Sequence, residues 1–291
     1  MKQTHLTPYA RLPRTYGRLE IVSSTVDAWG RAHWLLAERL PAHAGDDPYD
    51  AVVVTADDGG IQETHLSAAL PRRPALDALP DGGFVLADCR SRKDEEHAQV
   101  FDALGRPSWT FRLGDGIEHL IADEAGELWV GYFDEGVYGD DPLSSPGLRR
   151  FSCTGEPLWQ FQPGPGPMDM SDCYALNVGS RAAWACPYTH FPLLEIRADE
   201  RVKVRTTPVK GPKGLAVHGE RVTFFGGYQD EHDRLTHGRL TDTSVEPAGY
   251  GQLVRPDGSG LGRRQVVCRG PRIYVREKAS PTQWTVLDIS G

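Results

Sequence analysis

The sequence has little asparagine, no paired cysteines and no long apolar stretch, and each shortage excludes a class of protein. The five cysteines form no C-x-x-C pair and match no zinc-ligand spacing, so we expect buried thiols in a reducing compartment. No stretch approaches the roughly 18 apolar residues of a membrane helix, and the first residues lack the apolar run of a signal peptide. The sequence therefore predicts a cytoplasmic protein that does not associate with a membrane.

An excess of positive charge is also missing. The formal net charge is −8, and the paired arginines are scattered, so a nucleic-acid or anionic-membrane partner has no electrostatic support. The chain contains no H-E-x-x-H motif, no P-loop and no dinucleotide fingerprint, and it has no G-x-S-x-G motif in a strand–turn–helix context. The sequence therefore lacks the signatures of these metalloprotease, nucleotide-binding and α/β-hydrolase classes.

Glycine and proline, in contrast, are abundant, with 32 and 22 residues, which indicates many tight turns. Two of these turns lie in a repeat. The segments VFDALGRPSWTF (100–111) and RFSCTGEPLWQF (150–161) share Phe, Gly, Pro, Trp and Phe in register at an offset of fifty residues. Each copy predicts two strands joined at the glycine.

A second pattern occurs six times: an apolar strand, a turn that contains glycine, and a strand rich in aromatic and branched residues. The turn glycines are Gly30, Gly82, Gly126, Gly179, Gly219 and Gly270. The average spacing of about 48 residues fits propeller blades of four strands each. The predicted fold is all-β, a single β-propeller domain over residues 1–291 with six four-stranded blades. We expect Trp109, Trp129, Trp159 and Trp184 to lie in the core between blades.

The last unit supplies only three strands before the chain ends at Gly291. The N-terminal segment HLTPYARLP precedes the first full unit and provides a fourth. Pairing the two termini in one blade would remove exposed sheet edges. We therefore predict strand closure of the last blade by the two ends of the chain.

The third unit contains the pattern D-x-x-G-x-L-W-V-G between Asp123 and Gly131. This segment resembles the repeats of two-component-regulator propellers, and more loosely those of the six-bladed NHL and SMP-30/strictosidine-synthase-like propellers. The resemblance implies the propeller fold and assigns no specific family. It implies no function, because propellers include binding modules, scaffolds and enzymes.

Loop length differs between the two rims of the predicted propeller. With strands A to D counted from the channel outward, the A–B and C–D turns share one rim, which we call the turn rim. The B–C and D–A connections share the other, the loop rim. The A–B turns are short, whereas the B–C connections are long and varied, including 38–50, 88–99 and 132–147. Long loops are usually functional, so the loop rim is predicted to be the working face.

A ligand site is therefore expected at the channel mouth on the loop rim. Tyr132 and Tyr188 are further aromatic residues expected on this face, as are the acidic residues Asp230 and Glu231 and the imidazole of His232. The residues predicted to bind the ligand are His119, Asp134, Glu135, Tyr138, Asp172, Tyr174, His190, Lys213, Tyr228 and Arg264.

Three functions fit this face. The leading hypothesis is a propeller that binds a small polar molecule or a peptide. The alternative is a propeller enzyme, a lyase, cyclase or hydrolase of specialised metabolism, with Glu118, His119 and Asp172 as candidate catalytic residues. A buried Glu118 beside His119 would suit acid–base chemistry. The third is a protein-interaction scaffold.

No cofactor and no metal site is predicted, although the acidic segment 134–141 offers carboxylates to a divalent cation at the channel mouth. SMP-30-like enzymes hold calcium through Glu, Asp and two Asn side chains. The single asparagine of this chain, Asn177, precedes a turn glycine and is expected at the opposite rim. The resemblance therefore does not carry that metal chemistry to this chain.

Overall fold

A computed structural model describes residues 2–39, 47–92, 94–164 and 169–291. Two compact units make up the chain: Arg11–Gln162, and Met1–Ala10 together with Pro163–Gly291. The middle of the predicted long loop 38–50 and residue 93 of loop 88–99 lie outside the described residues. No helix among the described residues has the length and apolar character needed to cross a membrane.

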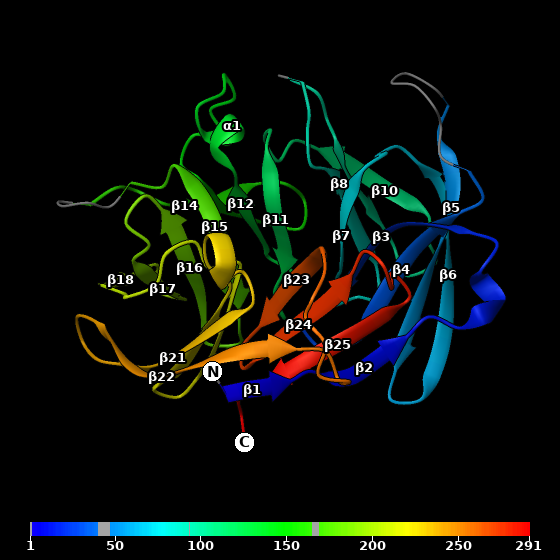
Figure 1. The fold of residues 1–291 in the computed structure, drawn as a ribbon. Helices are drawn as coiled ribbons and strands as arrows, with labels where there is room; N and C mark the ends of the chain where they lie inside the picture. Colours follow the sequence, from blue (N-terminus) through cyan, green and yellow to red (C-terminus); the bar gives the residue numbers. More distant parts are fainter. Residues whose placement is uncertain (1, 40–46, 93, 165–168) are drawn as a thin grey trace. The chain divides into compact units, whose positions relative to one another are not determined.

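The Arg11–Gln162 unit consists of three four-stranded antiparallel sheets, preceded by the short 3-10 helix η1 (Arg14–Tyr16) (Figure 1). The first contains β3 (Glu20–Val26), β4 (Ala32–Ala37), β5 (Tyr49–Asp57) and β6 (Gly60–Ala69). The second contains β7 (Pro74–Ala78), β8 (Phe84–Asp88), β9 (Ala98–Phe101) and β10 (Pro107–Phe111). The third contains β11 (Ile117–Ala122), β12 (Leu128–Tyr132), β13 (Leu148–Phe151) and β14 (Pro157–Gln160), with the one-turn helix α1 (Asp134–Val137) after β12.

The other unit, which we call the C-terminal unit, also consists of three sheets. The first contains β15 (Asp172–Val178), β16 (Ala182–Tyr188), β17 (Leu193–Arg197) and β18 (Val202–Arg205). The second contains β19 (Gly214–His218), β20 (Arg221–Phe225), β21 (Arg234–Leu240) and β22 (Val245–Val254), with the 3-10 helix η2 (Gln229–Glu231) before β21. The third contains β23 (Arg264–Arg269), β24 (Arg272–Glu277), β25 (Gln283–Asp288) and β2 (Thr7–Arg11).

These six sheets are the blades of a six-bladed β-propeller, which confirms the predicted fold. Each predicted turn glycine joins the first and second strands of a blade. At Gly126, which has a φ of +86°, the Asp123 carboxylate accepts backbone N–H bonds from Ala125 and Glu127 at 3.0 and 2.9 Å. The glycine supplies the left-handed conformation and the aspartate satisfies the donors of the turn.

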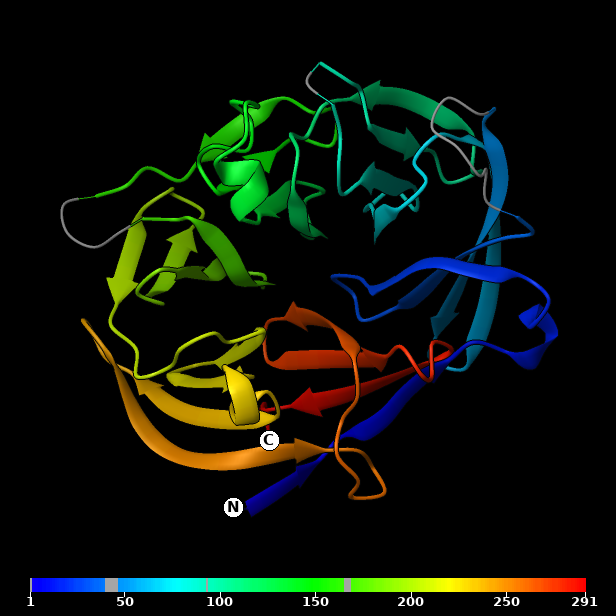
Figure 2. The ribbon, with the colours of Figure 1, turned by 45° about the horizontal axis from the view of Figure 1, so that its top comes forward.

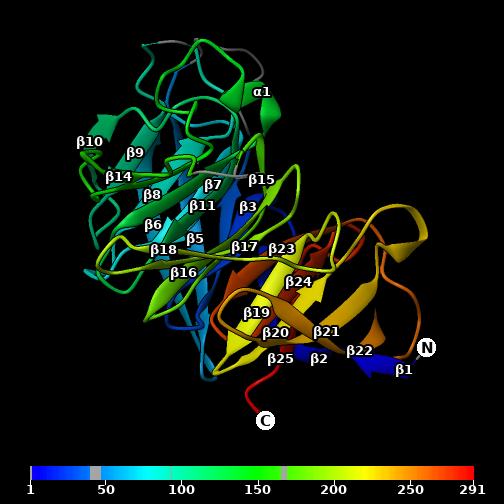
Figure 3. The same ribbon diagram turned by 90° about the vertical axis from the view of Figure 1, so that its left-hand side faces the viewer.

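The predicted closure is confirmed as well, because β2 pairs with β25 in the last blade. The preceding strand, β1 (Lys2–His5), was not predicted. It pairs in parallel with β22, from Lys2 opposite Gly251 to His5 opposite Val254, and makes that blade five-stranded. Figure 2 shows these two dark-blue strands running beside the orange β22 and the red β25, and Figure 3 shows β1 next to β22. The N-terminal segment thus joins two neighbouring blades.

Alternation along the strands places apolar side chains between consecutive blades. In the Arg11–Gln162 unit, Val85 of β8 and Val100 of β9 pack in one cluster with Leu120 of β11 and Val130 of β12. A corresponding cluster in the C-terminal unit joins Cys186 and Leu193 to Leu215 and Phe224. Because each sheet needs its neighbour to cover its apolar face, the core is distributed between blades.

The expectation that Trp109 lies in this core is wrong. Trp109 is 41% exposed on β10, the outermost strand of its blade, and its Nε1 donates to the Cys153 carbonyl at 3.0 Å. An outer strand has no further strand to cover it, so its aromatic side chain packs over an adjacent turn. Trp129, by contrast, is only 4% exposed, and the fully buried tryptophans are Trp34 and Trp284.

Candidate functional site

At the loop-rim end of the C-terminal unit, two neighbouring blades bring several predicted residues together. Asp172 at the start of β15 is opposite Tyr188 at the end of β16. In the next blade, Gly214 at the start of β19 is opposite Phe225 at the end of β20. Antiparallel pairing therefore places the segment before β19 and the loop after β20 at one end of their blade. The contacts of Lys213 and Tyr228 with Tyr174 show that this is the end at which Asp172 lies. This geometry brings Lys213 and Tyr228 close to Tyr174.

Four aromatic rings form a cluster here, which we call the tyrosine cluster: Tyr174, Tyr188, Phe191 and Tyr228. The ring centroids of Tyr174 and Phe191 are 5.1 Å apart, and Tyr174 stacks on Tyr188 at 5.9 Å. Tyr228 meets Tyr174 edge-on at 6.1 Å and Phe191 at 5.9 Å. Aromatic pairs in such arrangements contribute about 0.5–1.5 kcal/mol each beyond the area they bury. These contacts hold the four rings against one another.

Phe191 forms the base of the cluster and is 3% exposed, whereas Tyr188 and Tyr228 are 39% and 43% exposed. Phe191 has a φ of +54°, a conformation that costs a non-glycine residue about 1–3 kcal/mol unless its surroundings enforce it. Its amide donates to the Pro187 carbonyl at 3.1 Å, and its own carbonyl accepts from the Thr207 hydroxyl at 2.7 Å. These two bonds hold the ring beneath the tyrosines.

Tyr228 is oriented by a hydrogen bond and by a glycine. Its hydroxyl donates to the Tyr174 hydroxyl at 3.1 Å. The Tyr228 ring lies against Gly211, where a Cβ atom would be only 3.0 Å from ring carbons. Burial, this hydrogen bond and the nearby Asp172 charge together raise the pKa of Tyr228 above its ordinary value. Tyr228 is therefore held as a neutral phenol.

Lys213 adds a positive charge to the cluster. Its ammonium nitrogen lies 4.2 Å from the centroid of the Tyr174 ring, within the range of a cation–π contact. The backbone fixes the position of Lys213, because its amide donates to the Phe225 carbonyl at 2.7 Å. The side chain remains exposed, so the ammonium group is accessible to a ligand.

The other predicted residues of this unit have different environments. Arg264 is held by Asp233, with 2.5 Å between Nη1 and Oδ1, and its guanidinium lies over the Phe225 ring at 5.0 Å. This arrangement gives Arg264 a structural role. His190 is exposed in the turn after β16, and His232 Nδ1 donates to the Gln229 carbonyl at 3.1 Å.

The remaining predicted residues belong to the Arg11–Gln162 unit. Glu118 is exposed on β11 and His119 is half-buried, so the burial expected for a catalytic Glu118 is absent. Asp134 and Glu135 lie on α1, where Glu135 forms an ion pair with Arg90. Tyr138, which follows α1, is 74% exposed.

Tyr132 does not present its side chain on the surface as expected. It is fully buried, and its hydroxyl donates to the Leu113 carbonyl. Tyr132 is the last residue of β12, whose residues are all buried, so it completes the core of that blade.

Three observations bear on metal binding. Among the described residues, no group of three or more His, Cys, Asp or Glu side chains has the geometry to hold a metal ion. In the acidic segment, Asp141 is 4% exposed and pairs with Arg112 at 2.7 Å, so this carboxylate is used within the protein. The Asn177 side chain is likewise bonded to backbone groups of Leu215 and Gly270.

No protein-family model matches the sequence, and no curated protein matches it significantly. Solved structures do resemble the fold. A streptogramin B lyase aligns with 12% identity and a TM-score of 0.52 over 90% of this chain and 77% of that chain. A virginiamycin B lyase from Staphylococcus aureus has 13% identity and a TM-score of 0.49 over 96% of this chain and 98% of that chain.

A third structure, BamB from Moraxella catarrhalis, has 15% identity and a TM-score of 0.47 over 93% of this chain and 72% of that chain. The likeness to the streptogramin B lyase shows the fold alone. A function for this chain has to come from its own side chains.

Phe191 is the member of the tyrosine cluster that the sequence did not reveal. In the segment CPYTHFP, a phenylalanine before proline resembles an ordinary core residue. Tyr174, Lys213 and Tyr228 were found because they flank strands at the predicted loop rim. The signal for Phe191 was its position between two prolines in a connection that also contains a tyrosine.

Proposed function

We propose that this protein is a ligand-binding β-propeller that binds a small polar molecule or a peptide at the tyrosine cluster. The observation that carries the proposal is the placement of two part-exposed tyrosines on a fixed phenylalanine beside an exposed lysine. Tyrosines provide large rigid contact area at low entropic cost, together with hydroxyls that form hydrogen bonds. Exposed aromatic side chains that are gathered in one place are typical of interaction sites.

The side chains of the cluster indicate which chemical groups the ligand carries. A planar or apolar group would stack on Tyr188 and Tyr228, and a carboxylate would pair with the Lys213 ammonium. A peptide with one aromatic and one acidic side chain has both features, as does a small aromatic acid. Pairing with a carboxylate would draw the Lys213 ammonium partly away from the Tyr174 ring. The cation–π contact with Tyr174 is therefore the position of this ammonium when no ligand is bound.

Binding is favoured over proton transfer at this cluster. A tyrosine that acts as a general base needs a lowered pKa, and the pKa of Tyr228 is raised. The enzyme hypothesis with Glu118, His119 and Asp172 remains an alternative. The streptogramin B lyase that shares the fold adds no support to it, because the two sequences are too distant for an activity to be transferred. The scaffold hypothesis is the third alternative.

The test is saturation-transfer-difference NMR with phenylacetate and with an acetylated tetrapeptide that contains one phenylalanine and one glutamate. We expect transfer to the aromatic protons of both probes in the wild type. Transfer should fall at least fivefold in Tyr228→Ala and in Lys213→Met. Tyr250→Ala is the matched control, because Tyr250 is 47% exposed in the same unit but lies outside the cluster.

Equal transfer in wild type and Tyr228→Ala would contradict the proposal, as would an equal loss in the control. Transfer to the peptide alone would favour a protein or peptide partner over a small molecule. Turnover of either probe that disappears in Glu118→Gln would favour the enzyme hypothesis.

A further inference from the structure

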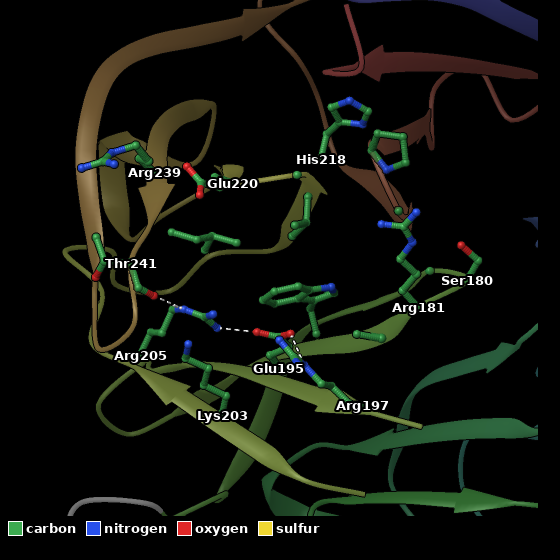
Figure 4. A pocket seen from close by; sticks show the side chains of 18 of the residues that line it. Ser180, Arg181, Glu195, Arg197, Lys203, Arg205, His218, Glu220, Arg239 and Thr241 are labelled. Atoms are coloured by element: carbon green, nitrogen blue, oxygen red, sulfur yellow. Dashed lines mark hydrogen bonds and ion pairs between the residues drawn. The ribbon is translucent and has the colours of Figure 1, made fainter. Parts of the chain in front are cut away.

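A large pocket lies at the turn-rim end of the same unit, away from the tyrosine cluster. Its volume is about 1110 Å³, and its walls come from all three blades of the C-terminal unit. The A–B turns supply Gly179, Gly219 and Gly270, and the outer strands supply charged side chains (Figure 4). Cβ atoms at Gly219 and Gly270 would meet nothing within 4 Å, so the turns leave this space open.

The charge of the pocket is opposite to that of the whole chain, whose formal charge is −8. Three carboxylates line it, from Glu195, Glu220 and Asp242. They face five basic side chains and one imidazole: Arg181, Arg197, Lys203, Arg205, Arg239 and His218. Positive charge that is concentrated in a concave surface attracts anions more strongly than the same charge on a flat surface.

Glu195 neutralises part of this charge and fixes two of the arginines. It is 6% exposed, with Oε1 2.7 Å from Arg197 Nε and Oε2 2.8 Å from Arg205 Nη1. Burial alone would raise the pKa of Glu195, but the two guanidinium groups hold it below its ordinary value. Arg205 also donates to the Thr241 carbonyl at 2.6 Å and lies over the Trp184 ring at 5.7 Å. The base of the pocket is therefore rigid.

Arg181 and His218 differ from these paired residues. Both side chains are exposed, and within the described part of the chain neither has a hydrogen-bond or ion-pair partner. Figure 4 shows them on one side of the pocket, and Lys203, Arg205 and Thr241 on the other. Lys203 does have a partner, Asp242, at 2.6 Å, but Asp242 is fully in solvent, so this pair is weak and exchangeable.

We propose that this pocket binds a small anionic molecule whose phosphate or carboxylate group pairs with Arg181 and His218 on one side of the pocket, while Lys203 faces the molecule from the other side. The guanidinium of Arg181 presents its donors in a fork that matches two oxygens of such a group. The Trp184 indole, which is partly exposed, forms an apolar wall for the rest of the ligand. The pocket size suits a molecule of cofactor dimensions.

The test is isothermal titration calorimetry with inorganic pyrophosphate and, separately, with citrate, at low and at high sodium chloride. We expect saturable binding of at least one probe in the wild type, and weaker binding at high salt because exposed charges are screened. The double variant Arg181→Ala/His218→Ala should weaken binding at least tenfold. It should unfold at the wild-type temperature, because neither side chain has a partner to lose.

Arg201→Ala is the matched control. Arg201 is exposed in the same unit and pairs with Asp199, but it does not line the pocket. Unchanged binding in the double variant, or an equal loss in the control, would overturn the proposal, as would no heat with either probe. Pyrophosphate binding alone indicates a phosphorylated ligand and citrate binding alone a carboxylate. Tyr228→Ala should leave this binding unchanged, which separates the pocket from the tyrosine cluster.

Discussion

Asn177 and Gly270 exchange two hydrogen bonds between the first and third blades of the C-terminal unit. The Asn177 Nδ2 donates to the Gly270 carbonyl at 2.9 Å, and its Oδ1 accepts from the Gly270 amide at 2.7 Å. The same Nδ2 also donates to the Leu215 carbonyl at 2.7 Å. The side chain is fully buried, and the single asparagine of the chain connects the first strands of two blades, β15 and β19, to the turn of a third.

Replacing Asn177 should destabilise the protein strongly. In Asn177→Ala the carbonyls of Leu215 and Gly270 lose a donor, and we expect the free energy of unfolding to fall by about 2–4 kcal/mol. Asn177→Asp should cost more at pH 7, because a buried carboxylate would face two carbonyl oxygens. Urea unfolding measures both, with Ser180→Ala at an exposed neighbouring position as the control. An Asn177→Asp protein as stable as the wild type would contradict this role.

Gly211→Ala should disturb the tyrosine cluster beyond its effect on the backbone. Gly211 has a φ of +67°, and an added Cβ would meet the Tyr228 ring. We expect a loss of about 1–2 kcal/mol in stability and a displaced Tyr228. Gly59→Ala is the control, since Gly59 has a φ of +88° with nothing near an added Cβ. Heteronuclear NMR of the tyrosine side chains should show shifts for Tyr228 in the first variant alone.

Acid should destabilise the protein through Asp27, which is completely buried at the first blade turn. Its Oδ2 lies 2.8 Å from His33 Nε2 and 2.7 Å from Arg31 Nε. Burial opposes ionisation, but the bond to His33, the charges of His33 and Arg31 and a backbone bond lower the pKa below its ordinary 3.8. Stability from this carboxylate is therefore complete above about pH 5 and lost as the pH falls below 3.8.

Asp27→Asn provides the check. The variant should be less stable at pH 7 by about 2–4 kcal/mol, because the charge of Asp27 that pairs with Arg31 and His33 is lost. Its stability should then fall less steeply than that of the wild type between pH 5 and pH 3. Parallel stability curves for the two proteins would show that Asp27 does not carry this pH dependence.

Removal of the two N-terminal strands should have separable effects. A chain that starts at residue 7 loses β1 but keeps β2, and it should unfold a few degrees lower because β22 becomes an edge strand. A chain that starts at residue 13 also exposes the edge of β25 and should aggregate. Thermal unfolding and size-exclusion chromatography measure these outcomes. Equal behaviour of the two truncations would argue against closure of the last blade by β2.

The repeats predicted the fold because every blade needs the same two features, a tight turn between its first two strands and strands with alternating apolar residues. Gly126 and Gly270 mark turns that need a left-handed residue, and apolar alternation marks the flanking strands. The strand β1 could not be predicted, because its sequence KQTH has no apolar alternation and its parallel pairing to β22 spans nearly the whole chain. Trp109 was misplaced because the same pattern does not distinguish an inner strand from an outer one.

The candidate sites were predicted only in part. Tyr174, Lys213 and Tyr228 follow from the order of strands in a blade, which determines the end at which each residue lies. The contact of Lys213 with Tyr174 depends on side-chain directions across two blades, which the order of strands does not determine. The basic pocket was missed because Arg181, Arg205 and Arg239 are far apart in sequence and belong to short turns and outer strands.

The pairing of β1 and β2 with β22 and β25 has a consequence for synthesis of the chain. The strands β1 and β2 are synthesised long before their partners β22 and β25. At typical elongation rates of about 5–20 residues per second, these strands wait for about 12–50 seconds without partners. Arg11–Gln162 is continuous and can acquire its contacts during that interval. Completion of the C-terminal unit instead requires β22 and β25, so a translation stop before these strands would leave β1 and β2 without their partners.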